Sequence, residues 1–550
     1  MPVLVGLSMK ILHNACIYTL DPCNPIASAI VTDHEQILAV GTHSLLTEFD
    51  GRAQKEDLGG KVILPGLTDA HIHLQHYALS LQNIDCETET YTECLHRISE
   101  RASKSEPGEW ILGHGWNLNQ WKDIPPAWEG RGTEREAWWP TAADLDAVAP
   151  NNPIYLTAKS LHTAWVNTTA LRLANIAANT PDPDNGRIQR DAGGQPTGIL
   201  LETATELVSQ VIPQPSVERL AEALQQAQSM LWRVGVTCVH DFDRRACFMA
   251  LQQLHALGNL HLRVIKGIPA EDLPHAVALG LSTGFGDDWL RIGSLKVFMD
   301  GALGPRTAAM FQPYLNEPKN RGMLNMDAEE LFEIGRRATQ IGISLAVHAI
   351  GDRANHEVLN AFAQLRSFEK MNNIPALRHR VEHVQLIHPD DTGRLAELAL
   401  TASMQPIHAP SDMIMADRFW GERASLAYAW RTHQKHGTHL AFGSDAPVES
   451  PNPFWGLHAA TTRQRADGSP GPEGWYPEQR LTVQEALEGY TIGAAYAAGM
   501  DGRLGRLATG YLADLIVINT DPFACSSADL LELQPVATMV GGEWVWRSEG

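Results

Sequence analysis

The residues that could carry chemistry begin with His71 and His73, which are separated by a single residue. They come directly after VILPGLTDA, an apolar run that is typical of a strand. Side chains at i and i+2 of a strand lie on the same face, so both imidazoles would face one site. Neutral imidazoles are good ligands for zinc and similar divalent ions. Taken alone, the pair indicates two buried, hydrogen-bonded histidines as readily as a metal site.

Three more residues of suitable type end other strand-like runs. His348 lies near the end of ISLAVHA, His383 lies in RVEHVQL, and Asp445 closes HLAFGSD. In a (β/α)₈ barrel the carboxyl ends of the strands meet at one face, where catalysis takes place. Histidines in apolar strands each need a buried partner, so four of them favour a shared metal site over four isolated burials.

Lys296, in the apolar run SLKVFMD, is the sixth candidate ligand. A buried ammonium is costly unless it is paired or deprotonated. Two interpretations stay open. A neutral Lys296 could take up carbon dioxide and bridge two metal ions as a carbamate, or the lysine could pair with Asp300 or another acid. Asp300 would then be that partner or would contact the substrate.

The mechanism expected of these residue types is hydrolysis. A metal ion lowers the pKa of its bound water to about 7, which supplies hydroxide at neutral pH. Asp445, as metal ligand and general acid/base, would accept the proton of the water and pass it to the leaving group. The metal, or a histidine not bound to it, would polarise the scissile carbonyl. We expect one or two divalent ions, and zinc suits a His-rich site best, ahead of iron, manganese and cobalt.

The elements that must position these residues alternate strand-like runs with amphipathic helices, which indicates a parallel sheet. Eight runs qualify, and eight strands close a barrel. The predicted strands are residues 62–69, 236–242, 260–267, 291–300, 343–349, 380–386, 400–406 and 439–445.

Two helices between these strands are predicted with their ends. Ser216 would cap the first helix and Gly235 would end it. Asp327 and Glu330 have capping-box spacing before the second helix, which Gly342 would end. The predicted apolar stripe of the first helix is Leu220, Ala223, Leu224, Ala227, Met230 and Leu231.

The predicted fold class is α/β, a (β/α)₈ TIM barrel over residues 65–499 with two additions. Residues 1–64 and 500–550 are β-rich, and we expect both termini to form one small β-sandwich domain. About 165 residues separate the first two strands, against 2–6 in a usual βα loop. We therefore predict an inserted, Trp-rich subdomain at about 80–215.

The composition excludes several classes of partner. Of the 550 residues, 43 are Lys or Arg and 64 are Asp or Glu, so the net charge is −21. Such a surface repels nucleic acid and anionic membranes. No apolar run is long enough to span a membrane, and the first residues lack a basic region, so we expect no signal peptide. The seven scattered cysteines favour reduced thiols and a cytoplasmic protein. We expect a small-molecule substrate, and a homodimer is the common default.

The order of these motifs resembles that of the metal-dependent amidohydrolase superfamily. Further segments, among them KVFMDGALGPRTAAM, VHAIGDRANHEVL, FGSDAPVESPNP and GRLATGYLADLIVI, are similar to its YtcJ-like branch, amidohydrolase family 3. That branch includes N-substituted formamide deformylase-like enzymes. The resemblance covers nearly the whole chain. It implies a barrel with a β-sandwich from both termini and hydrolysis of a non-peptide C–N bond.

The resemblance also implies roles for single residues. His71 and His73 match the metal ligands of the first strand, and Lys296 matches the position that is carboxylated in binuclear members. The other matches are His348 and His383 as ligands of the second metal and Asp445 as the catalytic aspartate.

Substrate contacts are less specific, and packing or loop hydrogen bonding explains each candidate as well. Relatives often carry an acid two residues before the histidine of HTAWVN, where this chain has Ser160 before His162. His240 and Asp241 end the second strand and could orient a ligand. The candidates for substrate contact are His162, Trp116, Asp300, Arg353, Gln405 and His408.

Two alternatives to an amide hydrolase stay open. A deaminase of an amino-heterocycle could use the same barrel, but such sites commonly place a Glu three residues after the fifth-strand histidine. Here Gly351 stands three residues after His348. A non-catalytic scaffold would be expected to have lost a ligand or Asp445, and none is lost.

Overall fold

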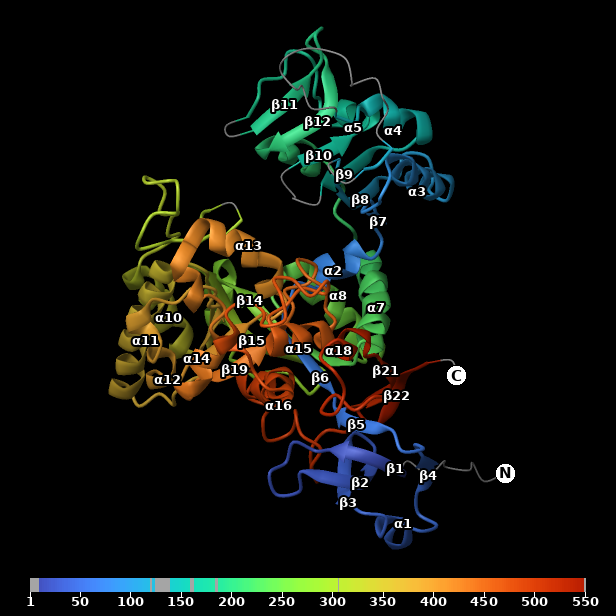
Figure 1. The fold of residues 1–550 in the computed structure, drawn as a ribbon, viewed down its shortest axis with the longest axis vertical. Helices are drawn as coiled ribbons and strands as arrows, with labels where there is room; N and C mark the ends of the chain where they lie inside the picture. Colours follow the sequence, from blue (N-terminus) through green and yellow to red (C-terminus); the bar gives the residue numbers. More distant parts are fainter. Residues whose placement is uncertain are drawn as a thin grey trace. The chain divides into compact units, whose positions relative to one another are not determined.

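The protein forms two compact units, residues 78–219 and a larger unit made of residues 1–77 and 220–550 (Figure 1). The structure is a computed structural model that describes residues 9–118, 121–123, 139–158, 163–183, 186–304 and 306–548.

The larger unit is built on an eight-stranded parallel sheet in the order β19-β18-β17-β16-β15-β14-β13-β6. Its edges meet beyond the end of β19, where the Asp445 N–H donates to His71 O at 2.7 Å and the His73 N–H donates to Ala446 O at 2.9 Å. The predicted barrel is therefore confirmed as a nearly closed ring of eight parallel strands. These are β6 (Leu67–Ile72), β13 (Val236–Asp241), β14 (Arg263–Pro269), β15 (Leu290–Phe298), β16 (Leu345–Ala349), β17 (Arg380–His383), β18 (Thr401–Met404) and β19 (His439–Phe442).

The first predicted strand, residues 62–69, is divided at Gly66. β5 (Val62–Pro65) pairs in the sheet of the chain ends, whereas β6 belongs to the barrel. A Cβ at Gly66 would lie 2.4 Å from Thr237 Oγ1, so the crossing between the sheets requires a glycine. The prediction of a single strand there is wrong, because the chain passes from one sheet to the other.

Strands from both ends of the chain form a second eight-stranded sheet, in the order β22-β21-β20-β5-β1-β2-β3, with β4 also paired to β1. A buried ion pair joins it to the barrel, with Arg263 Nε 2.6 Å from Asp514 Oδ2. The β-sandwich itself stays a prediction. The remaining strands are β1 (Met9–Tyr18), β2 (Ile26–Asp33), β3 (Gln36–Gly41), β4 (Gln54–Asp57), β20 (Leu515–Ile518), β21 (Pro535–Val540) and β22 (Glu543–Arg547).

Both predicted helices form with the predicted ends. Gly235 ends α7 (Val217–Arg233), and the capping box of Asp327 and Glu330 begins α10 (Ala328–Gln340). Met230 was wrongly placed in the apolar stripe of α7: its side chain is 38% exposed, because it lies at the margin of the buried face.

No helix among the described residues is both long and apolar enough to cross a membrane. The larger unit has further helices, of which the first packs against β1 and β2 in the sheet of the chain ends. They are α1 (Leu45–Glu48), α2 (Leu74–Ser80), α8 (Arg245–Ala256), α9 (Leu273–Leu279), α11 (Asp352–Met371), α12 (Arg394–Glu397), α13 (His408–Trp420), α14 (Trp430–Lys435), α15 (Pro453–Thr462), α16 (Val483–Glu488), α17 (Ala494–Ala497) and α18 (Asp529–Glu532).

The smaller unit has its own six-stranded sheet, in the order β11-β12-β10-β9-β8-β7, and its own tryptophan-rich core. Trp116 is buried there, next to Trp121 and Trp165, and its Nε1 donates to Leu156 O at 3.0 Å. The elements are β7 (Ile84–Asp85), β8 (Ile111–Trp116), β9 (Ile154–Ala158), β10 (Thr163–Val166), β11 (Gly186–Arg190), β12 (Pro196–Glu202), α3 (Tyr91–Ser103), α4 (Ala142–Val148), α5 (Thr168–Leu173) and α6 (Glu206–Ser209).

Candidate metal centre and active site

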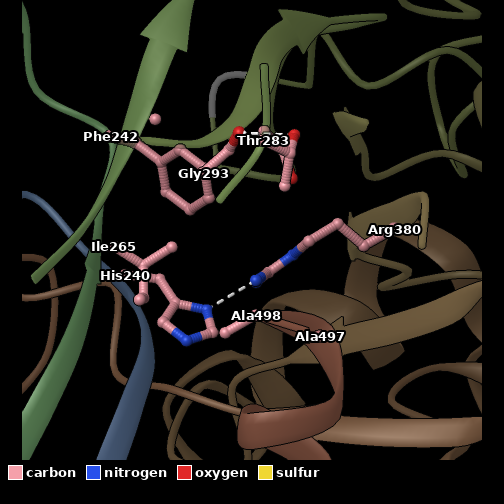
Figure 2. A pocket seen from close by; sticks show the side chains of 10 residues that line it. His240, Phe242, Ile265, Thr283, Gly293, Arg380, Ala497 and Ala498 are labelled. Atoms are coloured by element: carbon pink, nitrogen blue, oxygen red, sulfur yellow. Dashed lines mark hydrogen bonds between the residues drawn. The ribbon is translucent and has the colours of Figure 1, made fainter. Parts of the chain in front are cut away.

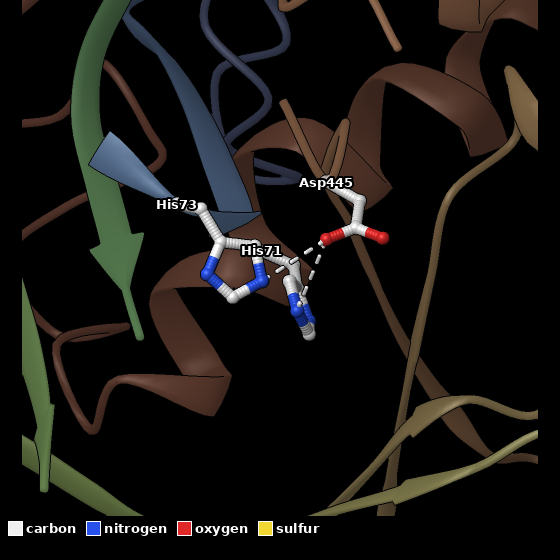
Figure 3. A group of neighbouring side chains, drawn as sticks. All are labelled: His71, His73 and Asp445. Atoms are coloured by element: carbon white, nitrogen blue, oxygen red, sulfur yellow. Dashed lines mark ion pairs between the residues drawn. The ribbon is translucent and has the colours of Figure 1, made fainter. Parts of the chain in front are cut away.

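Three predicted ligands meet where β6 and β19 end. His71 Nε2 lies 3.6 Å from Asp445 Oδ1, and His73 Nε2 lies 3.4 Å from the same oxygen. Figure 3 shows both imidazoles beside that carboxylate. The three potential ligand atoms all lie within 4.8 Å of one another. One cation could therefore contact all three side chains.

The other two histidines complete the cluster. The ring centroid of His383 lies 4.7 Å from that of His71 and 4.7 Å from that of His348. β6, β16 and β17 thus bring their histidines together at the carboxyl ends of the strands, as the barrel geometry requires.

Each of the four imidazoles has one ring nitrogen fixed by an oxygen. Carboxylate, carbonyl and side-chain amide oxygens only accept, so the histidine N–H donates in every pair and the other nitrogen keeps its lone pair. A neutral imidazole oriented in this way is the usual arrangement of a metal ligand, so the donor set fits a divalent metal. The pairs are His71 Nδ1 with Glu382 Oε2 at 2.6 Å, His73 Nδ1 with Asp243 Oδ1 at 3.1 Å, His348 Nε2 with Gly301 O at 3.0 Å and His383 Nδ1 with Gln405 Oε1 at 2.8 Å.

Burial keeps most of these rings neutral. It lowers the pKa of His71 and of His383 well below the usual range, and that of His348 to about 4. Burial acts in the same direction on His73, but the hydrogen bond to Asp243 together with the negative charges of Asp445 and Asp243 outweighs it, and the pKa of that ring is raised. Three imidazoles are therefore ready to bind a metal at neutral pH without first losing a proton.

Lys296 lies inside this cluster, with its Nζ 3.3 Å from His71 Nε2 and 4.6 Å from the ring centroid of Phe242. Among the described residues, no carboxylate oxygen lies within 4.0 Å of this amine. Burial lowers the pKa of Lys296 to about 8. The suggested pairing with Asp300 is therefore wrong, because β15 directs the lysine towards histidines, and the amine is partly neutral near physiological pH.

Asp300 instead ties backbone segments together. Its buried carboxylate accepts from the N–H groups of Ala309, Ile350 and Gly351 at 2.8, 3.0 and 2.9 Å. Burial raises its pKa to about 7. The geometry gives Asp300 the role of holding the turn after β16, and the suggested contact with substrate stays a prediction.

Two further candidates lie in the cluster. Gln405 is buried and fixes His383, and His408 Nε2 lies 4.0 Å from Asp445 Oδ2. Trp116 packs in the core of the smaller unit. Arg353 is exposed in the first turn of α11. His162 lies outside the described residues.

Sequence reasoning missed the carboxylates that orient the ligands. Glu382 directly precedes His383, and Asp243 follows the second strand, yet neither was selected. Their signal was available, because an acid within an apolar strand or just beyond it is rarely buried without a partner. Asp69 lies in the same motif as His71, but the sequence indicates no role for it; its carboxylate accepts from the Ser444 N–H at 3.0 Å and so links β6 to the segment that carries Asp445.

The backbone is strained at two of the ligands. His383 has a φ of 72° and Asp445 a φ of 61°, both in the left-handed region that side chains other than glycine rarely adopt. Such conformations persist where the surroundings hold them, and they cluster at active sites.

The comparisons with known proteins agree with this geometry. A sequence model of the amidohydrolase family matches residues 54–546. The chain is 32% identical over 544 residues to YtcJ of Bacillus subtilis (strain 168), covering 97% of this chain and 98% of YtcJ. It is 30% identical over 567 residues to the N-substituted formamide deformylase of Arthrobacter pascens, with 96% of each chain covered.

Among solved structures, an uncharacterized metal-dependent hydrolase of Pyrococcus horikoshii matches with a TM-score of 0.78 and 28% identity, over 94% of this chain and 99% of that one. The resemblance noted in the motifs is confirmed, and the chain belongs to the amidohydrolase family.

Proposed function

We propose that the protein is a metal-dependent amidohydrolase that cleaves a non-peptide C–N bond of the amide or N-substituted formamide type in a small molecule. Family membership supports a hydrolase. The observation that carries the proposal is the cluster of four imidazoles, each with one nitrogen fixed by an oxygen, two of which lie within 4 Å of Asp445. The formamide deformylase among its relatives supports the bond type.

Two ligand sets would hold two divalent ions, for which zinc fits the nitrogen-rich donors best. His71, His73 and Asp445 would hold one ion, and His348 and His383 the other. A divalent ion at this position supplies Lewis-acid polarisation of the scissile carbonyl and activation of a water molecule.

Asp445 would move the proton of the reaction. Its Oδ1 faces His71 and His73, whereas its Oδ2 faces His408. The carboxylate would accept a proton from the attacking water as the new C–O bond forms. It would return that proton to the leaving nitrogen as the C–N bond breaks, so that a carboxylic acid and an amine result.

Lys296 would act as a bridging ligand after carboxylation. Its neutral amine would add to carbon dioxide, forming an N–C bond and releasing one proton, and the resulting carbamate offers two oxygen donors. Two observations support this role: the amine lies 3.3 Å from His71 Nε2, and its pKa near 8 leaves a neutral fraction at neutral pH.

A substrate panel tests the proposal. The zinc-loaded protein would be incubated with N-substituted formamides, simple amides and amino-heterocycles, and released amine, formate and ammonia would be measured. We expect amine release from formamides or amides. Ammonia release from the heterocycles alone would favour the deaminase, and the absence of any turnover by metal-loaded protein would contradict the proposal.

A further inference from the structure

A row of buried polar side chains lies next to His71, on the side of its ring away from Asp445. The row consists of Glu382, Arg380 and His240. We infer that His240 and Arg380 are positioning residues, which hold Glu382 and, through it, the imidazole of His71 in the orientation that binds metal. This inference rests on the proposed metal site.

The first link is the hydrogen bond from His71 Nδ1 to Glu382 Oε2 at 2.6 Å. Both side chains are fully buried. A metal-bound histidine depends on such a partner for its tautomer and ring orientation. Any shift of the Glu382 carboxylate would therefore turn the ring of His71.

The second link is the guanidinium of Arg380, which fixes the carboxylate. It donates to both oxygens of Glu382, with the Nη2–Oε2 distance at 3.0 Å. The same group donates to Ala70 O at 2.6 Å and to Ser403 Oγ. Arg380 thus connects β17 to β6 and β18. Its third nitrogen, Nη1, contacts none of these partners.

Nη1 reaches His240 Nδ1 at 2.7 Å, as Figure 2 shows. Arginine has no acceptor and stays charged, so Nδ1 must accept and the proton of His240 must lie on Nε2. Burial and the charge of Arg380 keep the pKa of His240 well below its usual range. The ring is therefore a neutral acceptor at the end of the row.

A small cavity lies beside this contact. Its volume is about 10 Å³, enough for about one water molecule, and it is lined by His240, Phe242, Ser294 and Arg380 among others. No described residue accepts from His240 Nε2. The cavity leaves space for a slightly larger ring at position 240, so His240→Phe would remove the acceptor for Arg380 without crowding the barrel.

The test measures zinc affinity of the full-length metal-free protein by competition with a chromogenic chelator, and thermal unfolding of the same samples. His240→Phe leaves Nη1 without its acceptor, which frees the guanidinium to shift, so we expect zinc affinity to fall by about tenfold. His240→Asn places an amide oxygen near the position of Nδ1, and we expect it to keep an affinity close to that of the original protein.

His379→Phe is the matched control. His379 directly precedes Arg380 and is also fully buried, but the hydrogen bonds of its side chain run to Glu369 Oε1 and to the N–H of Leu345, both at 3.0 Å, and not to Glu382, Arg380 or His240. We expect it to lower the unfolding temperature without changing zinc affinity. Equal zinc affinity of His240→Phe and the original protein would overturn this inference but leave the proposed metal site standing. Failure of the original protein to bind zinc or another divalent ion would overturn the proposed metal site and the inference with it.

Discussion

At the residue scale, Asp445 is the group on which turnover should depend most. Asp445→Asn keeps the shape of the side chain but cannot accept a proton, so kcat should fall by about 10²- to 10⁴-fold. Metal content and unfolding temperature should change little, because the histidines remain and the amide oxygen of Asn can replace the carboxylate oxygen as a ligand. Asp390→Asn, at a 90% exposed acid, is the control and should leave kcat unchanged. Equal kcat for Asp445→Asn and the original protein would remove Asp445 from the proton transfer.

Lys296 allows a second test at this scale. Its pKa of about 8 means that the neutral amine, which alone reacts with carbon dioxide, increases as the pH rises through that value. Zinc loading of metal-free protein should therefore increase with added bicarbonate, and more at pH above 8 than below it. Lys296→Ala should hold less metal, and short-chain carboxylic acids should restore part of its activity.

Elemental analysis of Lys296→Ala shows whether Lys296 is a bridging ligand of the metal centre. Full metal occupancy in that variant, with no response to bicarbonate in the original protein, would show that the lysine is not a bridging ligand.

At the scale of elements, Gly66 separates two sheets. Gly66→Ala would place a Cβ 2.4 Å from Thr237 Oγ1, so the free energy of unfolding should fall by about 1–3 kcal/mol. Adding Thr237→Ala removes that oxygen, and the double variant should recover part of the loss. Denaturant unfolding measures both. Gly502→Ala, where a Cβ would meet nothing within 4 Å, is the control. Independent, additive effects of the two substitutions would contradict this account.

The strands of the barrel differ in how well the sequence predicts them. The eight barrel strands were predictable because each is a short apolar run between helical patterns. The division at Gly66 was not, because the run VILPGL continues without a polar side chain across it and the residues on both sides are buried. The pattern of hydrophobic residues reports burial but not which sheet provides it.

The residues of the site also differ in how far the sequence predicts them. His71, His73, His348 and His383 were predictable from their types at strand ends. Acids such as Glu382 could be predicted to be buried and paired, but which histidine each of them fixes could not, because that depends on contacts between distant positions: His71 and Glu382 are 311 residues apart in the sequence. Gln405 is a predicted substrate contact, and in the structure its Oε1 accepts a hydrogen bond from His383.

At the scale of the whole molecule, buried neutral histidines should make stability depend on pH. Burial lowers the pKa of His433, in α14, from 6.5 to about 4. Between these values the unfolded chain binds a proton that the folded chain does not, so stability is lost as the pH falls. The contribution is about 3 kcal/mol. His433→Leu should flatten the pH dependence of the free energy of unfolding between pH 6.5 and 4.

Denaturant titrations at several pH values on metal-free protein provide the measurement. An unchanged slope in His433→Leu, or a gain of stability in the original protein on acidification over this range, would show that the buried ring is not the cause.

The four histidines, Lys296 and Asp445 would together form a two-metal centre. The most direct test is the metal content per chain, measured by elemental mass spectrometry on protein purified without chelator. We expect close to two divalent ions per chain, chiefly zinc. A content close to one would contradict the bridging role of Lys296, and no bound metal even after reconstitution with zinc would contradict the metal centre itself.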